Sequence, residues 1–369
     1  MKKIIIKFYI IFLLVTISGC ETSKSINYDL NINKVSIETL RITNNSEILG
    51  SIDSSGVYKW LGIPYAEKPI NGLRWRAPRE IENYSKKYEA TSFKEPCVQF
   101  QSSLTNNGLV KPGAIVGSED CLYLNIYSPA LSKDQISRDN INLPVMVWIH
   151  GGGNTTGMPS EYNPEIFVKS ERIIFVSIAY RLGIFGWLSH PELREQDGID
   201  SSSNFALLDQ IMALKWVKEN IQFFGGNPNN ITIFGESAGG QNVIALYSSP
   251  LAKGLFDRAI SQSGGTSVTS IKDAEKINRS DPSYKSSYKN RHVTTEEWVN
   301  ILNKKGLIPS KFGEKNNLFD IRSLDSSALM SGIDKGEFWS SQRDLARIIS
   351  DNVVIPEEGI LETLKDASK

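Results

Sequence analysis

The chain has 369 residues, of which 40% are apolar and 9% are aromatic. That length and composition are typical of a globular protein with a large buried core, and they exclude an intrinsically disordered chain. Lysine and arginine together number 41, and so do aspartate and glutamate, so the formal net charge is zero. Because this balance lacks a basic excess, we expect no nucleic acid as a partner.

The N-terminal residues have the pattern of a bacterial lipoprotein signal. Lysines flank and lead into an apolar run, residues 4–17, and the small residues that follow it end at Cys20. The run is too short to span a bilayer comfortably, and its end resembles a lipobox, in which the cysteine is lipidated and becomes the new N-terminus. We therefore expect residues 1–19 to be removed, residues 20–33 to form a tether, and the exported protein to be anchored at Cys20 on the periplasmic or cell-surface side of a bacterial membrane. An uncleaved anchor is the alternative.

The three cysteines agree with export. If Cys20 carries the lipid, Cys97 and Cys121 remain as an even pair in an oxidising compartment. A disulfide between them would stabilise the fold by roughly 3 kcal/mol. Two buried free thiols are the alternative. No Cys-x-x-Cys or histidine cluster accompanies the pair, so we expect no metal site.

The first predicted strands lie within residues 36–65, where apolar and polar residues alternate weakly. We expect a small antiparallel sheet there, capping the main domain. Three stronger apolar, β-branched runs follow at residues 122–127, 145–149 and 173–180. Long connections separate these runs and nothing interrupts them, which predicts buried parallel strands.

Helices and strands alternate in the next part of the chain. Apolar residues near helical spacing predict a packed amphipathic helix over residues 204–223. A strand at 231–234, a helix at 238–247 and a strand at 258–263 are predicted after it. This alternation predicts an α/β fold with a mostly parallel, doubly wound sheet.

Residues 266–350 differ from what precedes them, because their first part is polar and rich in lysine and serine. Helices are predicted within this region at residues 295–305 and 340–349. We interpret the region as an insertion over the top of the sheet, where such folds place lids and pockets. Residues 34–369 are expected to form one domain.

A Gly-x-Ser-x-Gly pentapeptide centres on Ser237. The bare pattern arises by chance in roughly one chain of this length in ten. Here, however, it follows a β-branched strand and precedes a helical stretch rich in small residues, which is typical of a strained turn that exposes a nucleophilic serine. Gly235 and Gly239 leave room for strand and helix to approach, and Ala238 offers a backbone N–H at a helix N-terminus. We predict Ser237 as a nucleophile; a structural serine in a tight turn is the alternative.

A second motif, His150-Gly151-Gly152-Gly153, directly follows the strand predicted at 145–149. A glycine-rich turn in that place aims backbone N–H groups at a tetrahedral oxyanion, as the HGGG motif of lipases and esterases does. We predict Gly152, Gly153 and Ala238 as the donors. A phosphate-binding loop or a plain turn is the alternative, but the spacing lacks both G-x-G-x-x-G and a Lys-Ser/Thr ending.

Taken together, these segments resemble the type B carboxylesterases, the cholinesterase-like branch of the α/β-hydrolases. The resemblance includes two signature segments of that family, the Glu-Asp-Cys-Leu run at 119–122 and the run from Phe224 to Gly239. The other matching segments are residues 60–67, 73–78, 123–125, 148–153, 180–183 and 204–223. The resemblance implies an α/β-hydrolase fold and a serine esterase that needs no cofactor.

The resemblance also implies roles for single residues. It implies a disulfide between Cys97 and Cys121, a buried ion pair between Arg74 and Glu119, and a site shaped by Glu236 together with His150 and Gly151. For each of these residues, the alternative is an ordinary structural role in the core or at the surface.

The sequence departs from the family at three positions. Ser203 and Ala206 replace usual glycines near Asn204, and Asn154 replaces the usual aromatic residue after the glycines. These departures concern the acyl and alcohol pockets.

The histidines of this sequence do not supply an obvious base, which a serine nucleophile normally requires. His150 belongs to the glycine turn, His190 follows the Tyr-Arg-Leu-Gly segment, and His292 lies in the polar insertion. None occupies the position of the family's base, although His292 in a lid segment is an alternative. The resemblance implies that the triad acid and histidine come later than Lys369, so we expect a chain truncated at its C-terminus, with strands missing.

Truncation has a structural consequence. The strand predicted at 258–263 becomes an unpaired parallel edge, which favours aggregation or recruitment of a complementing C-terminal fragment. Glu357 and Glu358 are predicted to begin a solvated helix rather than to replace the triad acid.

The sequence therefore predicts an exported, lipid-anchored hydrolase of small-molecule carboxylic esters that works through a serine acyl-enzyme. Because the resemblance places the triad acid and histidine after Lys369, we expect this chain to be inactive or to need a complementing fragment. A catalytically silent binding or adhesion protein on the same scaffold, and an inactive fragment without function, are the alternatives.

Overall fold

The computed structural model of the chain describes residues 34–82, 85–102, 113–275, 294–333 and 347–367. Three predicted features lie outside these ranges: the signal and tether with Cys20, the segment around His292, and most of the helix predicted at 340–349. The last residue of that predicted helix, Ile349, lies in a short strand.

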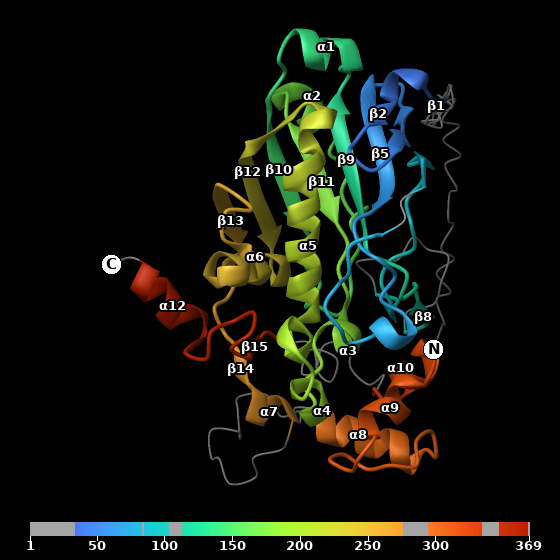
Figure 1. Ribbon diagram of the computed structural model, residues 1–369, viewed down its shortest axis with the longest axis vertical. Coiled ribbons are helices and arrows are strands. Elements are labelled where there is room, and N and C mark those ends of the chain that lie inside the picture. Colours follow the sequence, from blue (N-terminus) through green and yellow to red (C-terminus); the bar gives the residue numbers. More distant parts are fainter. Residues whose placement is uncertain (1–33, 83–84, 103–112, 276–293, 334–346, 368–369) are drawn as a thin grey trace, which may run out of the picture. The chain divides into compact units, whose positions relative to one another are not determined.

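The strands and helices follow the chain in the order drawn in Figure 1. The strands are β1 (Lys34–Val35), β2 (Arg41–Ile42), β3 (Glu47–Leu49), β4 (Ser51–Ile52), β5 (Val57–Pro64), β6 (Lys87–Glu89), β7 (Gln99–Phe100), β8 (Ile115–Val116), β9 (Tyr123–Pro129), β10 (Leu143–Ile149), β11 (Ile174–Ile178), β12 (Gly226–Glu236), β13 (Arg258–Gln262), β14 (Thr269–Ser270) and β15 (Ile349–Ser350). The helices are α1 (Lys133–Arg138), α2 (Glu165–Glu171), α3 (Gly183–Gly186), α4 (Pro191–Arg194), α5 (Phe205–Asn220), α6 (Ala238–Ser248), α7 (Ile271–Glu275), α8 (Thr295–Lys304), α9 (Asn317–Arg322), α10 (Ser326–Ser331) and α12 (Gly359–Ala367).

The main sheet of the described residues has the strand order β1-β4-β5-β9-β11-β10-β12-β13. The four strands from β11 to β13 in this order are parallel to one another. The strands from β1 to β9 pair antiparallel, and β9 also runs antiparallel to β11. The prediction of a parallel strand at 122–127 is therefore wrong, because an apolar run indicates burial on both faces and does not fix strand direction.

The N-terminal strands divide between two sheets. β2 and β3 pair antiparallel, as predicted for residues 36–65, and β6 adds a parallel third strand to this small sheet. β1, β4 and β5 instead extend the main sheet, which the sequence prediction missed. Gly50 makes the crossing between the sheets feasible, because a Cβ there would lie 2.3 Å from the carbonyl oxygen of Lys59.

Helices cover both faces of the sheet (Figure 1). Alternate residues of β10 point to opposite faces, as strand geometry requires. Val145, Val147 and Ile149 join the large core cluster together with α5 and α6, whereas Trp148 joins a second cluster that includes Val168 of α2. The sheet is thus doubly wound in the region of its parallel strands, which is an α/β-hydrolase arrangement.

The helix predicted at 204–223 is present as α5, but it is not amphipathic. Its polar residues Asp209, Gln210 and Asn220 are buried with the apolar ones. Asp209 is buried because it pairs with Arg181: the Arg181 Nε donates to its carboxylate over 2.8 Å. A buried charge is tolerated when it is paired and hydrogen-bonded in this way.

The helices α7 to α10 lie beyond the carboxyl ends of β10 to β12 (Figure 1). Two arginines dock this region on the N-terminal part of the chain. The Arg74 guanidinium donates to the carbonyl oxygens of Arg322 and Leu324, and the Arg322 guanidinium donates to those of Arg74 and Trp75. Across the residues that the structure describes, no helix is both long and apolar enough to cross a membrane.

Candidate active site

Ser237 lies at the junction of β12, which ends at Glu236, and α6, which begins at Ala238. Its backbone has φ 56° and ψ −118°, a conformation that a serine adopts only when its surroundings impose it. The side chain is exposed, and within the described ranges its hydroxyl has no hydrogen-bond partner. The Ser237 N–H donates to the carbonyl oxygen of Gln262 in β13 over 2.8 Å. The adjacent strand therefore helps to hold the strained turn.

The glycines on either side of the serine are required by close packing. A Cβ at Gly235 would lie 2.6 Å from the carbonyl oxygen of Ile149, and one at Gly239 would lie 2.1 Å from the same oxygen. The first turn of α6 therefore lies directly on the end of β10. This close packing explains why the residues on either side of Ser237 in the predicted elbow have to be small.

The turn His150–Gly153 continues from that end of β10 and contacts the elbow. A Cβ at Gly151 would lie 2.7 Å from the carbonyl oxygen of Glu236 and 3.5 Å from the Cβ of Ser237. The structure thus brings the two predicted motifs together, because β10 and β12 are neighbours in the sheet.

The predicted oxyanion donors lie in the glycine turn and at the start of α6. Gly152 and Gly153 have φ 85° and 64°, and a Cβ on Gly152 would lie 2.1 Å from the carbonyl oxygen of Thr156. Ala238 is in the first turn of α6, where N–H groups have no partner within the helix. Peptide N–H groups so placed suit a developing oxyanion. Their catalytic role stays a prediction.

A second carboxylate lies near the exposed Glu236. Glu161 is half-buried, and its burial, together with the negative charge of Glu236, raises the pKa of its carboxyl. The side of the elbow that carries Glu236 is therefore electronegative.

The two histidines in the described part of the chain, His150 and His190, are buried and make structural contacts. Burial lowers the pKa of His150 to about 4, its Nδ1 lies 3.0 Å from the carbonyl oxygen of Gly151, and its ring stacks on Tyr180. The Nε2 of His190 lies 2.8 Å from the Oδ1 of Asn317, and burial lowers the pKa of this histidine also. Both rings are thus committed to structural contacts.

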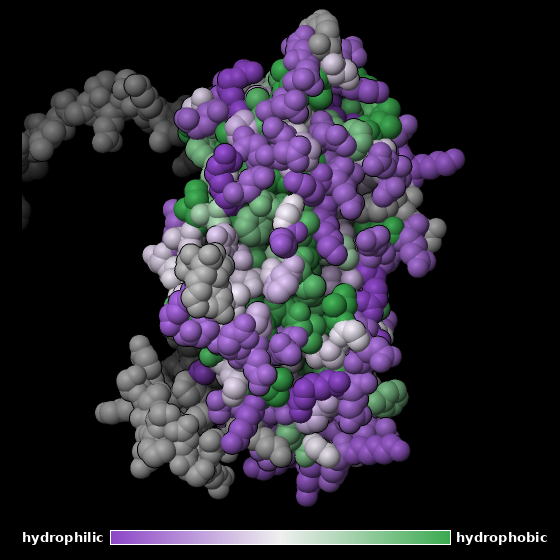
Figure 2. Space-filling model, turned by 60° about the vertical axis from the view of Figure 1, so that its left-hand side comes forward, coloured by the Kyte–Doolittle hydropathy of each residue, from purple (hydrophilic) through white to green (hydrophobic). Residues whose placement is uncertain are grey.

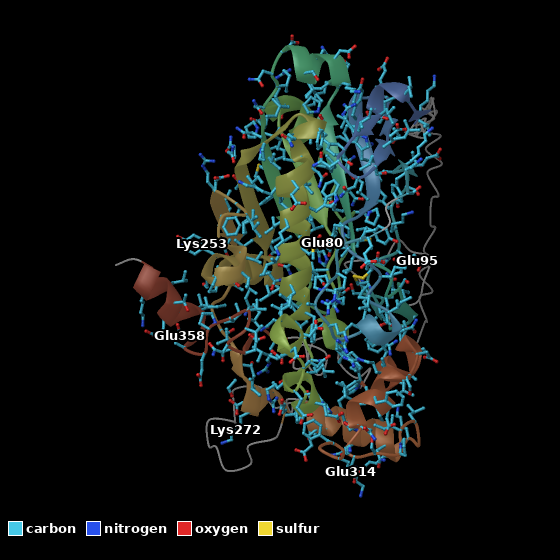
Figure 3. The ribbon with its side chains drawn as sticks, viewed as in Figure 1. Glu80, Glu95, Lys253, Lys272, Glu314 and Glu358 are labelled. Atoms are coloured by element: carbon cyan, nitrogen blue, oxygen red, sulfur yellow. A yellow bond between two sulfur atoms is a disulfide. The ribbon has the colours of Figure 1, made fainter. Side chains whose placement is uncertain are left out.

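Glu357 and Glu358 lie in the exposed turn before α12, as predicted (Figure 3 labels Glu358).

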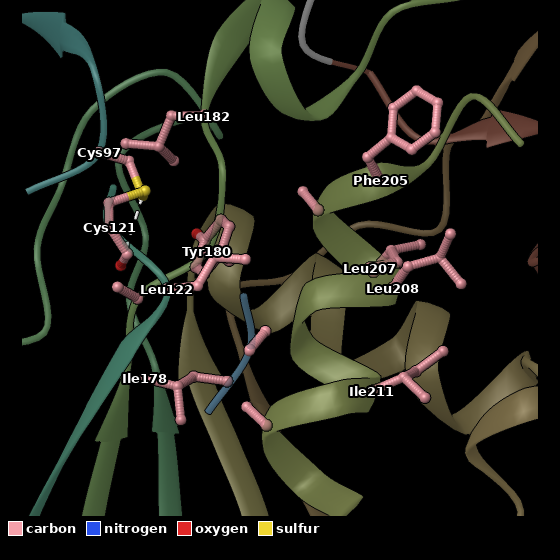
Figure 4. Packing of buried hydrophobic residues seen from close by; sticks show 14 of the residues in the cluster. Cys97, Cys121, Leu122, Ile178, Tyr180, Leu182, Phe205, Leu207, Leu208 and Ile211 are labelled. Carbon is pink, nitrogen blue, oxygen red and sulfur yellow. Dashed lines mark hydrogen bonds between the residues drawn. A yellow bond between two sulfur atoms is a disulfide. The ribbon is translucent and has the colours of Figure 1, made fainter. Parts of the chain in front are cut away.

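Cys97 and Cys121 form a disulfide, which Figure 4 shows beside Leu122 and Leu182. The bond joins the start of β9 to a segment that passes near the glycine turn. The predicted ion pair is also present: the Arg74 Nε donates to the Glu119 carboxylate over 2.6 Å, and both side chains are largely buried.

Gln99, which the sequence interpretation missed, supports the segment after the glycine turn. Its Oε1 accepts from the Thr156 hydroxyl over 2.6 Å and from the Gly157 N–H over 2.9 Å. Its Nε2 donates to the carbonyl oxygens of Gly157 and Cys97 over 2.9 and 3.0 Å. A fully buried amide with all these partners fixes the segment next to the disulfide. The one sequence signal for this role is that Gln99 follows the predicted disulfide cysteine Cys97 by two residues.

The departures from the family pattern are buried. Ser203 donates through its N–H to the carboxylate of Asp351 over 3.0 Å, and Ala206 packs against Gly186. Asn154 is 2% exposed, and its Oδ1 accepts a hydrogen bond from the Nδ2 of Asn242 over 2.9 Å. Asn242 had not been singled out in the sequence.

The part of the chain that the structure describes contains no group of three or more His, Cys, Asp or Glu able to hold a metal. Its chemistry is that of an exposed serine with backbone N–H groups beside it. Such an arrangement can hold an acyl group on the serine once a base takes the hydroxyl proton.

Comparisons with known proteins agree with this geometry. A sequence model described as the carboxylesterase family matches residues 38–340. The chain is 41% identical to the cocaine esterase of Oryctolagus cuniculus over 236 residues, which are 62% of this chain and 42% of that protein. It is 42% identical to the para-nitrobenzyl esterase of Bacillus subtilis (strain 168) over 226 residues, 61% of this chain and 43% of that protein.

Among solved structures, a PNB esterase superimposes with a TM-score of 0.71 at 30% identity. The match covers 90% of this chain and 61% of that one. The chain thus matches about two fifths of the length of these curated relatives.

Proposed function

Because this chain belongs to the carboxylesterase family, we propose that it provides the nucleophile half of a serine hydrolase that acts on small-molecule carboxylic esters. One observation carries the proposal: the strained, exposed Ser237 lies against the turn that bears Gly152 and Gly153. Relatives named cocaine esterase and para-nitrobenzyl esterase support an ester as the substrate class. Metal and organic cofactors have no part in the proposed reaction.

In the proposed mechanism, the Ser237 oxygen attacks the ester carbonyl carbon while a base takes its proton. The carbonyl oxygen becomes an oxyanion that accepts hydrogen bonds from the N–H groups of Gly152, Gly153 and Ala238. The alkoxide leaves with a proton, and an acyl-enzyme remains on Ser237. Water then attacks this ester by the same route and releases the carboxylic acid.

The base and its acid partner are proposed to come from a C-terminal segment beyond the described residues, either on the same polypeptide or on a complementing fragment. The edge strand β13 supports this proposal, since all five of its residues are exposed. One of them, Ile260, is apolar, and exposed apolar side chains also occur on α6 (Tyr247), just after α6 (Leu251) and on α12 (Leu361). Figure 2, which turns this side of the molecule toward the viewer, shows apolar surface among the polar residues. A further strand would pair with β13 and cover this surface.

We also propose export and lipid anchoring at Cys20. The lipobox-like sequence and the disulfide support it, because disulfides persist in oxidising compartments. Growth with an alkyne-tagged fatty acid should label the wild-type protein and leave Cys20→Ala unlabelled. Labelling of both proteins, or of neither, would contradict the proposal.

The esterase proposal is tested by the turnover of a short p-nitrophenyl ester, with Ser237→Ala as the control. Without a base, the oxyanion donors and binding alone are expected to give about 10³ to 10⁴-fold acceleration over water. Addition of a C-terminal segment that carries the acid and histidine should raise the rate further. Equal rates for wild type and Ser237→Ala, with and without that segment, would favour a silent binding protein instead.

A further inference from the structure

We propose that the Asn154–Asn242 amide pair is a positioning device that holds the oxyanion turn in register with the nucleophile helix. The inference rests on the proposed function, because it concerns the donors that this function needs. It assigns a role to the residue that replaces the family's usual aromatic side chain.

Asn154 directly follows Gly153 and has φ 59°, in the left-handed region. Asparagine tolerates this conformation better than other non-glycine residues, since its short amide can bond locally. Its carbonyl oxygen accepts a hydrogen bond from the N–H of Gly183 over 2.8 Å. The backbone of Asn154 is therefore fixed to a separate segment, and its buried side chain is directed at α6.

Asn242 is the partner on α6 and is fully buried. Its Nδ2 donates to the Oδ1 of Asn154 over 2.9 Å, while its own Oδ1 has no partner among the described residues. Asn242 lies four residues after Ala238, which places both on one face of the helix. One side-chain bond thus connects the helix that offers the Ala238 N–H with the turn that offers the Gly153 N–H.

The pair acts where the two motifs already touch. The contact of Gly239 with the Ile149 carbonyl brings the helix and the strand end together. Beyond His150 the turn is held from other segments by Tyr180, Gly183 and Gln99, and the asparagine pair adds a bond from the turn to α6 itself. Oxyanion donors work only within a narrow range of distances from the developing charge. A bond across the junction keeps the two sets of donors at a constant separation, which is what catalysis by preorganised N–H groups requires.

The first arm of the test needs no activity. Hydrogen–deuterium exchange is measured by mass spectrometry on the peptide with the amides of Thr155 and Thr156, which bond to the Gly152 carbonyl. In Asn242→Ala, exchange there should become about tenfold faster, as loss of one ordinary hydrogen bond implies, while β9 and β11 stay protected.

The matched control for this arm is Asn220→Ala. Asn220 is a buried asparagine whose amide donates within its own helix to the Trp216 carbonyl. It should leave exchange in the turn unchanged. Unchanged exchange in Asn242→Ala, or an equal increase throughout the chain, would overturn the proposal.

The second arm measures the rate at which a fluorophosphonate labels Ser237 when the segment that carries the acid and histidine is present. Asn154→Gly removes the acceptor but adopts the same φ without strain, so labelling should slow about tenfold. Asn154→Asp keeps an acceptor oxygen and should retain most of the rate. The double variant Asn154→Gly with Asn242→Ala should be no slower than Asn242→Ala alone, because the two residues share one bond and Asn242 also bonds Tyr180.

The two arms separate the possible failures. Faster exchange with an unchanged labelling rate would make the pair a merely structural contact and overturn its positioning role. A wild-type chain that does not label even with the segment that carries the acid and histidine would count against the proposed function. The exchange arm alone would then decide whether the pair holds the turn.

Discussion

The N–H of Ser237 donates a hydrogen bond to the carbonyl oxygen of Gln262, so the nucleophile elbow is tied to the last residue of the exposed edge strand β13. The elbow is strained, and strain persists only where neighbouring structure holds it. A strand that pairs with β13 would therefore also help to hold Ser237 in its strained position.

The first prediction concerns this edge. Ile260 is 45% exposed in β13, and a β-branched residue on an open edge favours strand pairing between chains. Ile260→Lys should reduce self-association in analytical ultracentrifugation at high protein concentration. Ile199→Lys, at an equally exposed residue outside any strand, is the control and should leave association unchanged. Equal effects of both substitutions would count against pairing through β13.

The second prediction concerns Gln99. Gln99→Leu keeps a side chain of similar size but removes the amide. The buried polar groups of Thr156, Gly157 and Cys97 then lose their hydrogen bonds. The free energy of unfolding in urea should fall by about 2 kcal/mol or more. Gln222→Leu is the comparison, and a smaller loss is expected there because this amide is exposed to solvent and donates to the Glu219 carbonyl on the same turn. An unfolding free energy unchanged by Gln99→Leu would contradict the role given to this amide.

The third prediction concerns the disulfide between Cys97 and Cys121. Its loss should lower the free energy of unfolding by roughly 3 kcal/mol, since the bond closes a loop in the unfolded chain. Calorimetry of the wild-type protein should therefore show a lower melting temperature after reduction. The variant with both cysteines replaced by serine should melt at the lower temperature with or without reductant. A wild-type melting temperature insensitive to complete reduction would contradict the prediction.

The fourth prediction is a loss of stability in acid. Burial lowers the pKa of His150 to about 4, below its ordinary value of 6.5. The unfolded chain therefore binds a proton at a higher pH than the folded chain does. The contribution is fully present above pH 6.5 and is lost as pH falls toward 4, in total of order 3 kcal/mol.

This fourth prediction is checked by urea unfolding between pH 7 and pH 4. His150→Phe preserves an aromatic ring against Tyr180 and should have a shallower dependence on pH. Some dependence should remain, because burial lowers the pKa of His190 as well. An unaltered slope in His150→Phe would mean that His150 does not cause the loss.

The sequence predicted the parts of the site that depend on local pattern. The glycines around Ser237 and after His150 were identifiable because close backbone approach excludes any other side chain there. The strand direction of β9 was not predictable in this way, because a run buried on both faces has the same composition in either direction. The extension of the main sheet by β1, β4 and β5 likewise depends on pairing between distant segments.

Contacts between single polar residues were the hardest to foresee. Asn154 stood out as a departure from the family, but its partner Asn242 lies 88 residues away and belongs to no motif. Gln99 reaches Gly157 across 58 residues. Such pairs arise from the tertiary fold, so neither periodicity nor composition indicates them.

The central claim is that Ser237 is a nucleophile, and labelling with a fluorophosphonate followed by peptide mapping tests it most directly. Ser263 is a demanding control, since it is also exposed and has φ 55° but lies in no elbow. In the presence of the segment that carries the acid and histidine, the account predicts one label per folded chain, located on Ser237, retained in Ser263→Ala and lost in Ser237→Ala and after denaturation. Labelling that survives Ser237→Ala, or that is as fast in the denatured chain as in the folded one, would contradict it.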